Sequence, residues 1–316
     1  MIKLISLWLC AGLLFALAAC GSAQEPTTSA PVAETTVTTQ ASGFPLTLET
    51  AIGPLTMPAR PEAIVSLAPT ATEMLAAIGA SGQLVAVDDQ SNYPADVPIT
   101  DLSGFTPNIE AIASYQPDLV VISNDIDNMV ASLQSLEIPV LLLPAAATLD
   151  NVYQQIELLG AATGHVEEAE QLTAQMSTEI SELVAGYTPP AEPVTYYHEL
   201  DPVLFSVTSS TFIGSIYSLF GLQSIADPAD PDGFGYPQLA EEYIIESDPA
   251  FIFLADTGFA GQSPETVAAR PGWDQLTAVT SGRVIPLDDD VASRWGPRVV
   301  DFVRSVAGAV ALHPAG

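Results

Sequence analysis

Positive charge is the scarcest feature of this 316-residue sequence, which has 7 Lys+Arg against 38 Asp+Glu and a formal net charge of −31. Lys3 is the only lysine, and the arginines are Arg60, Arg270, Arg283, Arg294, Arg298 and Arg304. A chain this acidic repels phosphate backbones and anionic lipid, which excludes nucleic-acid binding. The few arginines are therefore more informative about a ligand than the many carboxylates.

Histidine is scarce as well, with only His165, His198 and His313. These are too few and too dispersed for a zinc or manganese site built from several histidines. Tyr196-Tyr197-His198-Glu199 contains ligands for a bare ferric ion, but in a strand residues 196 and 198 face away from 197 and 199. We expect no resident metal or cofactor, and any iron or cobalt would arrive with the ligand.

An acidic stretch, Asp227-x-x-Asp230-x-Asp232-Gly233, looks like a calcium-binding loop. With Gly233 at the sixth position, however, Pro228 falls at the first and Leu239 at the twelfth, so the pattern fails. We predict an acidic surface loop.

Motifs of catalysis are missing too. The sequence has no G-x-S-x-G elbow, no P-loop and no G-x-G-x-x-G after a strand. The carboxylates are scattered, as expected for an acidic surface. We therefore expect a protein that is not an enzyme.

Both cysteines lie within the first twenty residues. A short positive start precedes the apolar stretch 5–18, and Leu17-Ala18-Ala19-Cys20 matches the cleavage pattern of a bacterial lipoprotein. The alternative is a transmembrane helix with an incidental cysteine, but the stretch is short for a span. We predict a signal peptide over 1–19, lipidation of Cys20 and a disordered tether over 20–43, which is rich in Thr, Ser, Ala and Pro.

Aliphatic strands alternating with helices dominate the chain from residue 60. Buried-strand patterns occur at 64–67, 84–87, 118–122 and 139–143, and again at 194–197, 251–254 and 284–287. Helical segments such as 69–79 and 108–115 separate them, which is typical of a parallel sheet covered on both faces. Before them, the alternation at 44–48 predicts an edge strand or hairpin around Gly53-Pro54.

One long helix is predicted between two such halves. Apolar residues at 166, 169, 172, 176, 180, 183 and 184 form a stripe of about five turns, ended by Gly186 and Pro189-Pro190. The simplest architecture is an α/β fold with an N-terminal lobe over 44–164, a linking helix over 165–187 and a C-terminal lobe over 188–316.

A weak internal repeat indicates that the two lobes are similar. Gly104-Phe105, a helix with Glu110 and a strand after Pro117 are matched by Gly235-Tyr236, a helix with Glu242 and a strand after Pro249. Glu110 and Glu242 are 132 residues apart, as are the two prolines. We interpret this as a duplication; the alternative is chance similarity between two βα units.

Several segments carry a family resemblance. They are 60–73 (RPEAIVSLAPTATE), Asn92-Tyr93-Pro94, Gly104-Phe105, 117–120, Tyr236-Pro237-Gln238, Pro271-Gly272-Trp273 and 293–298 (SRWGPR). In this order they resemble the iron-siderophore and cobalamin periplasmic-binding family from residue 60 to the end. The resemblance implies a class III periplasmic-binding-protein fold: two Rossmann-like lobes joined by one helix, with the ligand in the cleft between them. It also implies docking onto an ABC permease dimer with its ATPase.

The resemblance gives roles to two glutamates. In family members similar to the cobalamin binder, one glutamate at the tip of each lobe meets arginines of the permease, and Glu110 and Glu242 match those positions. The repeat places the same pair at equivalent points of the two lobes. Stabilisation of the helix dipole is a compatible alternative, worth about 0.5 kcal/mol each. Glu73 instead completes a predicted capping box with Thr70.

The candidate ligand residues lie in loops that the resemblance puts on the cleft rim. Aromatic faces with a few polar anchors suit such a cleft, although a lone loop aromatic more often packs on its own lobe. Arg294 suits a carboxylate or phosphate, and the alternative for it is an ion pair with the 288–290 aspartates. For Arg298 we favour the structural role. The candidates are Tyr93, Phe105, Tyr236, Asp290, Arg294 and Trp295.

The sequence therefore predicts an extracytoplasmic, lipid-anchored and monomeric solute-binding protein that delivers a ferric siderophore or a cobalamin-like chelate to an importer. Family members often carry tryptophan near positions 105 and 236, and its absence leaves the ligand class open. The alternatives are a binder of haem, molybdate or bare ferric ion, or a lipoprotein sensor or enzyme on the same scaffold.

Overall fold

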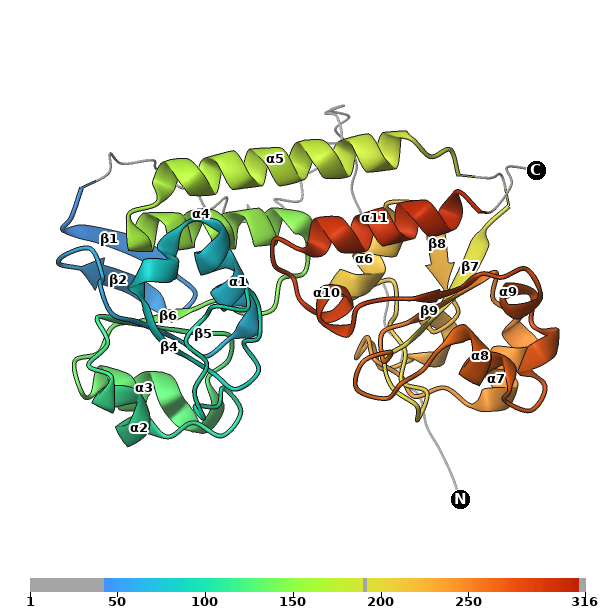
Figure 1. Ribbon diagram of the computed structural model, residues 1–316, viewed down its shortest axis with the longest axis horizontal. Coiled ribbons are helices and arrows are strands. Elements are labelled where there is room, and N and C mark those ends of the chain that lie inside the picture. Colours follow the sequence, from blue (N-terminus) through green and yellow to red (C-terminus); the bar gives the residue numbers. More distant parts are fainter. Residues whose placement is uncertain (1–42, 190–191, 313–316) are drawn as a thin grey trace, which may run out of the picture. The chain divides into compact units, whose positions relative to one another are not determined.

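The structure is a computed structural model that describes residues 43–189 and 192–312 (Figure 1). The predicted signal peptide, Cys20 and nearly all of the predicted tether lie outside the described residues, as does His313. The description below concerns residues from 43 onward, which belong to one unit of mutually contacting elements.

A β-hairpin precedes the larger sheets. β1 (Leu46–Thr50) pairs antiparallel with β2 (Gly53–Met57), with Thr50 opposite Gly53. Gly53 has a φ of 101°, a conformation that costs glycine little because it has no Cβ. The hairpin predicted around Gly53-Pro54 is confirmed.

The N-terminal lobe is built on a four-stranded parallel sheet in the order β4-β3-β5-β6. Every residue of β3 and β5 is buried, which explains why these strands read as unbroken aliphatic runs. The strands are β3 (Ile64–Ser66), β4 (Leu84–Val87), β5 (Leu119–Ile122) and β6 (Val140–Leu142). The helices of this lobe are α1 (Pro69–Ala77), α2 (Ile109–Ser114), α3 (Met129–Gln134) and α4 (Leu149–Thr163).

Helix α1 begins differently from the prediction. Its N-cap is Ala68, without a side-chain cap, and Pro69 is already the first helical residue. Thr70 thus lies inside the helix, so the predicted capping box with Glu73 is wrong. Glu73 is buried, and its carboxylate accepts hydrogen bonds from two arginines described below.

Helix α5 (Val166–Ala185) has the bounds of the predicted apolar stripe. It packs against α4 of the N-terminal lobe and against α11 (Val299–Val310), and Figure 1 shows it running alongside both. Its buried residues Met176 and Ile180 belong to one hydrophobic core that includes Ile64 and Phe302, so the core continues beneath α5 from one lobe to the other.

The C-terminal lobe repeats this architecture with a parallel sheet in the order β8-β7-β9-β10. The strands are β7 (Val194–Glu199), β8 (Leu222–Ser224), β9 (Phe251–Leu254) and β10 (Val284–Pro286). The helices are α6 (Phe212–Ser218), α7 (Glu241–Ser247), α8 (Pro264–Ala268), α9 (Thr277–Thr280), α10 (Asp289–Ser293) and α11, and short 3-10 turns complete both lobes.

The two sheets have the same topology, with β3 to β6 matched in order by β7 to β10. The sequence offset of 132 residues holds where the repeat was noticed, because β5 and β9 coincide at that offset and α2 and α7 start at it. Elsewhere the spacing changes, as loops of different length separate the remaining strands. The class III fold with two Rossmann-like lobes is confirmed.

Candidate functional site

The carboxyl-terminal edges of the two sheets define where a ligand would be expected, because α/β sheets bind ligands outside these strand ends. In the N-terminal lobe, the loop after β4 runs from Asp88 to Phe105. In the C-terminal lobe, the segments after β7, β9 and β10 begin at Leu200, Ala255 and Leu287. All six candidate ligand residues lie on these loops or on segments paired with them.

Phe105 is the most exposed of the candidates, at 65%. It follows Gly104, whose backbone packs so closely on the end of β3 that a Cβ there would lie 2.4 Å from the Leu67 carbonyl oxygen. Only glycine allows this approach, so the position of Phe105 is fixed by the residue before it.

Tyr236 is exposed at 47% and lies on a segment that pairs with the loop after β7. Thr208 N donates to Gly235 O at 2.9 Å, and Ser206 N donates to Pro237 O at 3.0 Å. Partial burial raises the pKa of the Tyr236 hydroxyl, which therefore remains a hydrogen-bond donor at neutral pH.

Three further exposed phenylalanines were not among the predicted site residues. Phe205, Phe234 and Phe259 are 37%, 79% and 68% exposed and lie on C-terminal-lobe loops. Phe234 and Phe259 each follow a glycine, as Phe105 does. This repeated Gly-Phe pair was the sequence signal that could have found them.

At the junction between the lobes, Arg294 is held by four partners. Its Nη1 donates to Glu73 Oε1 at 2.8 Å and to Asn92 Oδ1 at 2.9 Å. Its Nη2 donates to Gln90 O at 3.0 Å and lies 2.7 Å from Asp290 Oδ1. Asp290 also accepts from Asn92 Nδ2 at 2.8 Å. The ion pair with an aspartate, one alternative for Arg294, is thus present, and a ligand contact by Arg294 or Asp290 stays a prediction.

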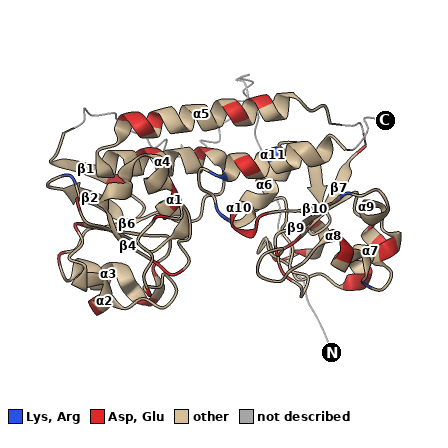
Figure 2. Cartoon of the chain, in the orientation of Figure 1, with Lys and Arg blue, Asp and Glu red and all other residues tan. Residues whose placement is uncertain are grey.

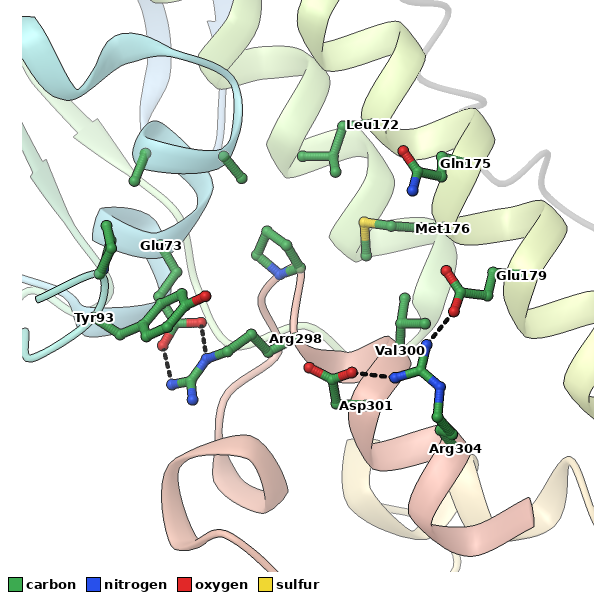
Figure 3. A pocket seen from close by; sticks show the side chains of 14 residues that line it. Glu73, Tyr93, Leu172, Gln175, Met176, Glu179, Arg298, Val300, Asp301 and Arg304 are labelled. Carbon is green, nitrogen blue, oxygen red and sulfur yellow. Dashed lines mark hydrogen bonds and ion pairs between the residues drawn. The ribbon is translucent and has the colours of Figure 1, made fainter. Parts of the chain in front are cut away.

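Arg298 grips the same glutamate with two nitrogens, at 2.9 and 2.6 Å, and its guanidinium stacks 4.3 Å above the Tyr93 ring (Figure 3). The structural role favoured for Arg298 therefore has a physical basis. Trp295 lies between the two arginines in sequence, but its indole nitrogen donates to Gln155 of α4 at 3.1 Å and its ring packs against the core. Tyr93, Asp290 and Arg294 are brought into one network, whereas Phe105 and Tyr236 stay apart from it.

A cavity of about 360 Å³ opens beside this network. It is lined by Glu73, Tyr93 and Arg298 together with residues of α5 and α11, including Met176 and Val300 (Figure 3). Phe105, Tyr236 and Trp295 do not line it. It is therefore a cavity of the lobe junction and not the expected ligand site.

A second buried charge group lies inside the C-terminal lobe. Arg270 donates to both oxygens of Glu199, at 2.6 and 2.5 Å, and stacks 4.6 Å from the Trp273 ring. Asp256 is fully buried, and neither of its oxygens has a hydrogen-bond donor among the described residues. Burial and the neighbouring Glu199 carboxylate raise the pKa of Asp256 to about 7.

The tyrosine-histidine strand follows the predicted alternation. Tyr196 packs into the core shared with Tyr217, whereas Tyr197 packs into the core of the opposite face beside Trp273. His198 Nδ1 lies 2.8 Å from the Tyr217 hydroxyl. Among the described residues, no group of three or more His, Cys, Asp or Glu side chains is placed to hold a metal ion.

The acidic loop from Asp227 to Gly233 stabilises the backbone. Asp227 accepts from Ser209 N and Oγ at 2.7 and 2.8 Å, and Asp230 accepts from Phe234 N and Gly235 N at 3.0 and 2.6 Å. These carboxylates hold the loop that presents Phe234 and Tyr236.

The predicted docking glutamates occupy equivalent positions. Glu110 and Glu242 are each the second residue of their helix, α2 and α7, and both are exposed. Neither makes a printed ion pair or hydrogen bond within the described part of the chain, whereas the adjacent Glu241 accepts from Trp273 Nε1 at 2.9 Å. Their docking role stays a prediction.

Every arginine in the described part of the chain has a partner within the chain. Arg60 donates to Thr163 O at 2.8 Å at the amino-terminal edge of its sheet, and Arg283 stacks on Phe251. Arg304 pairs with Glu179 and Asp301 beside α5. Figure 2 shows few basic segments, while acidic ones lie on α2, α5, α7 and many loops. No free cation faces the strand ends among the described residues.

Within the described ranges, none of the helices combines the length and apolar character that a membrane crossing requires. The burial patterns of α4, α5 and α11 are instead those of amphipathic helices packed on a core.

Comparison with known proteins identifies relatives across most of the chain. A family model described as periplasmic binding protein matches residues 64–291. An uncharacterised ABC transporter substrate-binding lipoprotein of Bacillus subtilis is 29% identical, over 93% of this chain and 92% of its own length. A cobalamin-binding protein of Halobacterium salinarum is 29% identical, over 85% of this chain and 75% of its own length.

Solved structures give the same picture. The periplasmic vitamin B12 binding protein of Vibrio cholerae has a TM-score of 0.67 and 25% identity, over 79% of this chain and 97% of its own. Haem-binding proteins also share the fold, at 22–23% identity for two of them. At such identities the likeness shows the fold alone.

Proposed function

The chain belongs to the periplasmic binding protein family, and on that premise we propose that it binds a corrinoid such as cobalamin between its two lobes and presents it to an ABC importer. The family supplies substrate-binding proteins to transporters, so the coarse role follows from membership. The proposal concerns the ligand, the membrane anchor and the absence of catalysis.

The observation that carries the choice of ligand is the engagement of all the described arginines. At the lobe junction Arg294 and Arg298 are bonded to Glu73, and in the C-terminal lobe Arg270 is bonded to Glu199. A ferric catecholate carries several negative charges and haem carries two propionates, so each needs cationic partners to offset desolvation. Without free cations, a strongly acidic cleft disfavours both.

A corrinoid suits the same cleft for the opposite reasons. Its periphery carries mostly neutral amide groups, which bond to hydroxyls and backbone groups without a cation. Its broad ring offers apolar area to exposed aromatic faces, here Phe105 on one lobe and Tyr236 and Phe259 on the other. The cobalamin-binding relative and the vitamin B12 binding structure support this choice.

Haem has a further requirement, an axial ligand to its iron. His198 is fully buried against Tyr217, and His165 lies between Arg60 and Gln83. Neither described histidine is available at the strand ends, which favours the corrinoid over haem.

The test is a binding panel on the purified protein, measured by quenching of its tryptophan fluorescence and by calorimetry. Cyanocobalamin is expected to bind, while haem and an anionic ferric catecholate are expected to fail. A neutral ferric hydroxamate that bound in place of cyanocobalamin would refute the corrinoid assignment. Tight binding of the catecholate would overturn the charge argument itself.

Two variants place the site. Phe105→Ala and Tyr236→Ala should each weaken cyanocobalamin binding about tenfold, the scale of one lost aromatic contact. Tyr115→Ala is the matched control, because Tyr115 is 37% exposed but follows α2, at the opposite edge of the sheet. Equal loss in all three variants would count against a site at the carboxyl-terminal strand ends.

The anchor and the delivery step complete the proposal. Cys20 and its flanking residues support lipidation after removal of residues 1–19, which would hold the protein outside the cytoplasm as a monomer on the membrane. Glu110 and Glu242 are the proposed contacts with the permease dimer, because they are exposed at equivalent tips of the two lobes.

A further inference from the structure

Glu73 joins two parts of the chain that are more than two hundred residues apart. Its Oε1 accepts from Arg294 Nη1 at 2.8 Å and from Arg298 Nη2 at 2.6 Å, and its Oε2 accepts from Arg298 Nε at 2.9 Å. The side chains of Glu73, Arg294 and Arg298 are 1%, 11% and 17% exposed. Both arginines thus share one buried carboxylate.

The partners are anchored in different lobes. Glu73 belongs to α1, which packs on β3 and α4 of the N-terminal lobe. The arginines follow α10, whose Asp289 accepts from Gly258 N and Phe259 N at 2.9 Å each, on the loop after β9. The bonds to Glu73 therefore cross from one lobe to the other.

A second set of bonds crosses at the same place. Asn92 and the Gln90 carbonyl, on the loop after β4, contact Arg294, and Asn92 also donates to Asp290. Close packing accompanies these bonds, because a Cβ at Gly296 would lie 3.4 Å from Glu73 Oε2 and 3.6 Å from Thr70 O. The C-terminal-lobe segment thus lies directly on α1.

We infer that Glu73, Asn92, Asp290, Arg294 and Arg298 form an interlobe clasp that fixes the separation of the two lobes, and that Glu73 is a positioning residue for the ligand cleft. Exposed ion pairs rearrange at little cost, but a buried carboxylate cannot leave its arginines without stranding charges away from water. The clasp also holds Tyr93, whose ring lies under the Arg298 guanidinium. A fixed separation lowers the cost of ordering the cleft when a rigid ligand binds.

The clasp rests on the proposed function only for its effect on ligand binding, so its test begins without ligand. Spin labels at Ser114→Cys and Glu246→Cys report the interlobe distance by pulsed electron paramagnetic resonance, in a chain that carries Cys10→Ser and Cys20→Ser. Both label sites are exposed, and they lie at equivalent places on α2 and α7. Glu73→Gln should make the distance distribution at least about twice as broad, as the lobes gain hinge freedom.

The matched control is Glu199→Gln. Glu199 is an equally buried carboxylate gripped by one arginine through two nitrogens, but the whole pair lies inside the C-terminal lobe. Its distance distribution should match that of the wild type. Equal broadening in both variants would reflect general loosening and would overturn the clasp.

A milder variant covers the case in which Glu73→Gln does not fold. Arg298→Lys keeps the charge but loses the two-nitrogen contact with Glu73 and the stacking on Tyr93. It should broaden the distribution in the same direction as Glu73→Gln. An unchanged distribution in the folded variants refutes the clasp.

Ligand binding forms the second arm of the experiment. Cyanocobalamin should bind Glu73→Gln about tenfold more weakly than wild type, since the looser cleft must be ordered at the expense of binding energy. If wild type itself fails to bind cyanocobalamin, the proposed function is wrong, and the distance measurement still decides the clasp.

Discussion

Replacing Asp256 by asparagine should reshape the pH dependence of stability in a calculable way. Asp256 is fully buried beside Glu199, with Arg270 and Tyr197 completing its charged and titratable surroundings. Burial first, and the Glu199 carboxylate second, raise the pKa of Asp256 from 3.8 to about 7. Asparagine has nearly the same shape and no proton to lose.

The sign follows from comparing the folded and unfolded chains. Between pH 4 and pH 7 the unfolded chain has lost the Asp256 proton while the folded chain keeps it. The free energy of unfolding therefore falls as pH rises, by about 1.4 kcal/mol per pH unit. Across the whole interval the decrease is at most about 4 kcal/mol. Asp88, whose pKa is also raised by burial, acts in the same direction.

His198 acts in the opposite direction. Complete burial lowers its pKa from 6.5 to about 3, so the unfolded chain takes up a proton that the folded chain refuses. The free energy of unfolding therefore rises with pH from about 3 to about 6.5, by about 1.4 kcal/mol per unit. In wild type the Asp256 and His198 slopes offset one another, and each variant should expose the remaining one.

The assay is urea unfolding followed by tryptophan fluorescence at pH 4.5, 5.5, 6.5 and 7.5, at constant ionic strength. The free energy of wild type minus that of Asp256→Asn should fall across this range, whereas the same difference for His198→Gln should rise up to pH 6.5. Asp274→Asn, an exposed aspartate of the same lobe, controls for the loss of one negative charge. A flat or rising difference for Asp256→Asn would refute the reasoning.

The remaining predictions concern delivery and anchoring. Glu110→Ala combined with Glu242→Ala should abolish stimulation of the transporter's ATPase while cyanocobalamin affinity stays within about twofold of wild type, because both side chains lie away from the strand ends; lost affinity would contradict a docking role, and Glu246→Ala on α7 serves as the control. Cys20→Ser should move the protein from the membrane fraction to the soluble fraction of expressing cells, since one diacylated residue supplies the anchor. Continued fractionation with membranes would refute lipidation.

Much of the fold could be predicted because its signals are local. Unbroken aliphatic runs marked β4, β5 and β9 within a residue of their observed bounds, and the apolar stripe marked α5 from Val166 to Ala185. The repeat placed Glu110 and Glu242 at equivalent helix starts. Such features depend on neighbours a few residues away, which a single sequence displays directly.

Weaker local signals escaped prediction. Helices α4 and α6 and the short strand β8 were not predicted, although Thr148 and Thr211 cap the two helices with side-chain hydrogen bonds. Three-residue β8 shows no pattern of its own, and its pairing with β7 decides its conformation. The exposed Phe234 and Phe259 were overlooked for a similar reason, since only their loops make them part of the site region.

The sequence by itself determined the α/β class, the two similar lobes, the joining helix and the scarcity of cations, because composition and periodicity are properties of the chain. The tertiary structure alone decided what those cations do. Thr70 and Glu73 fit a local capping pattern, yet Glu73 is bonded to Arg294 and Arg298, over two hundred residues away. Charges act through space, so their partners are decided only when the two lobes are brought together.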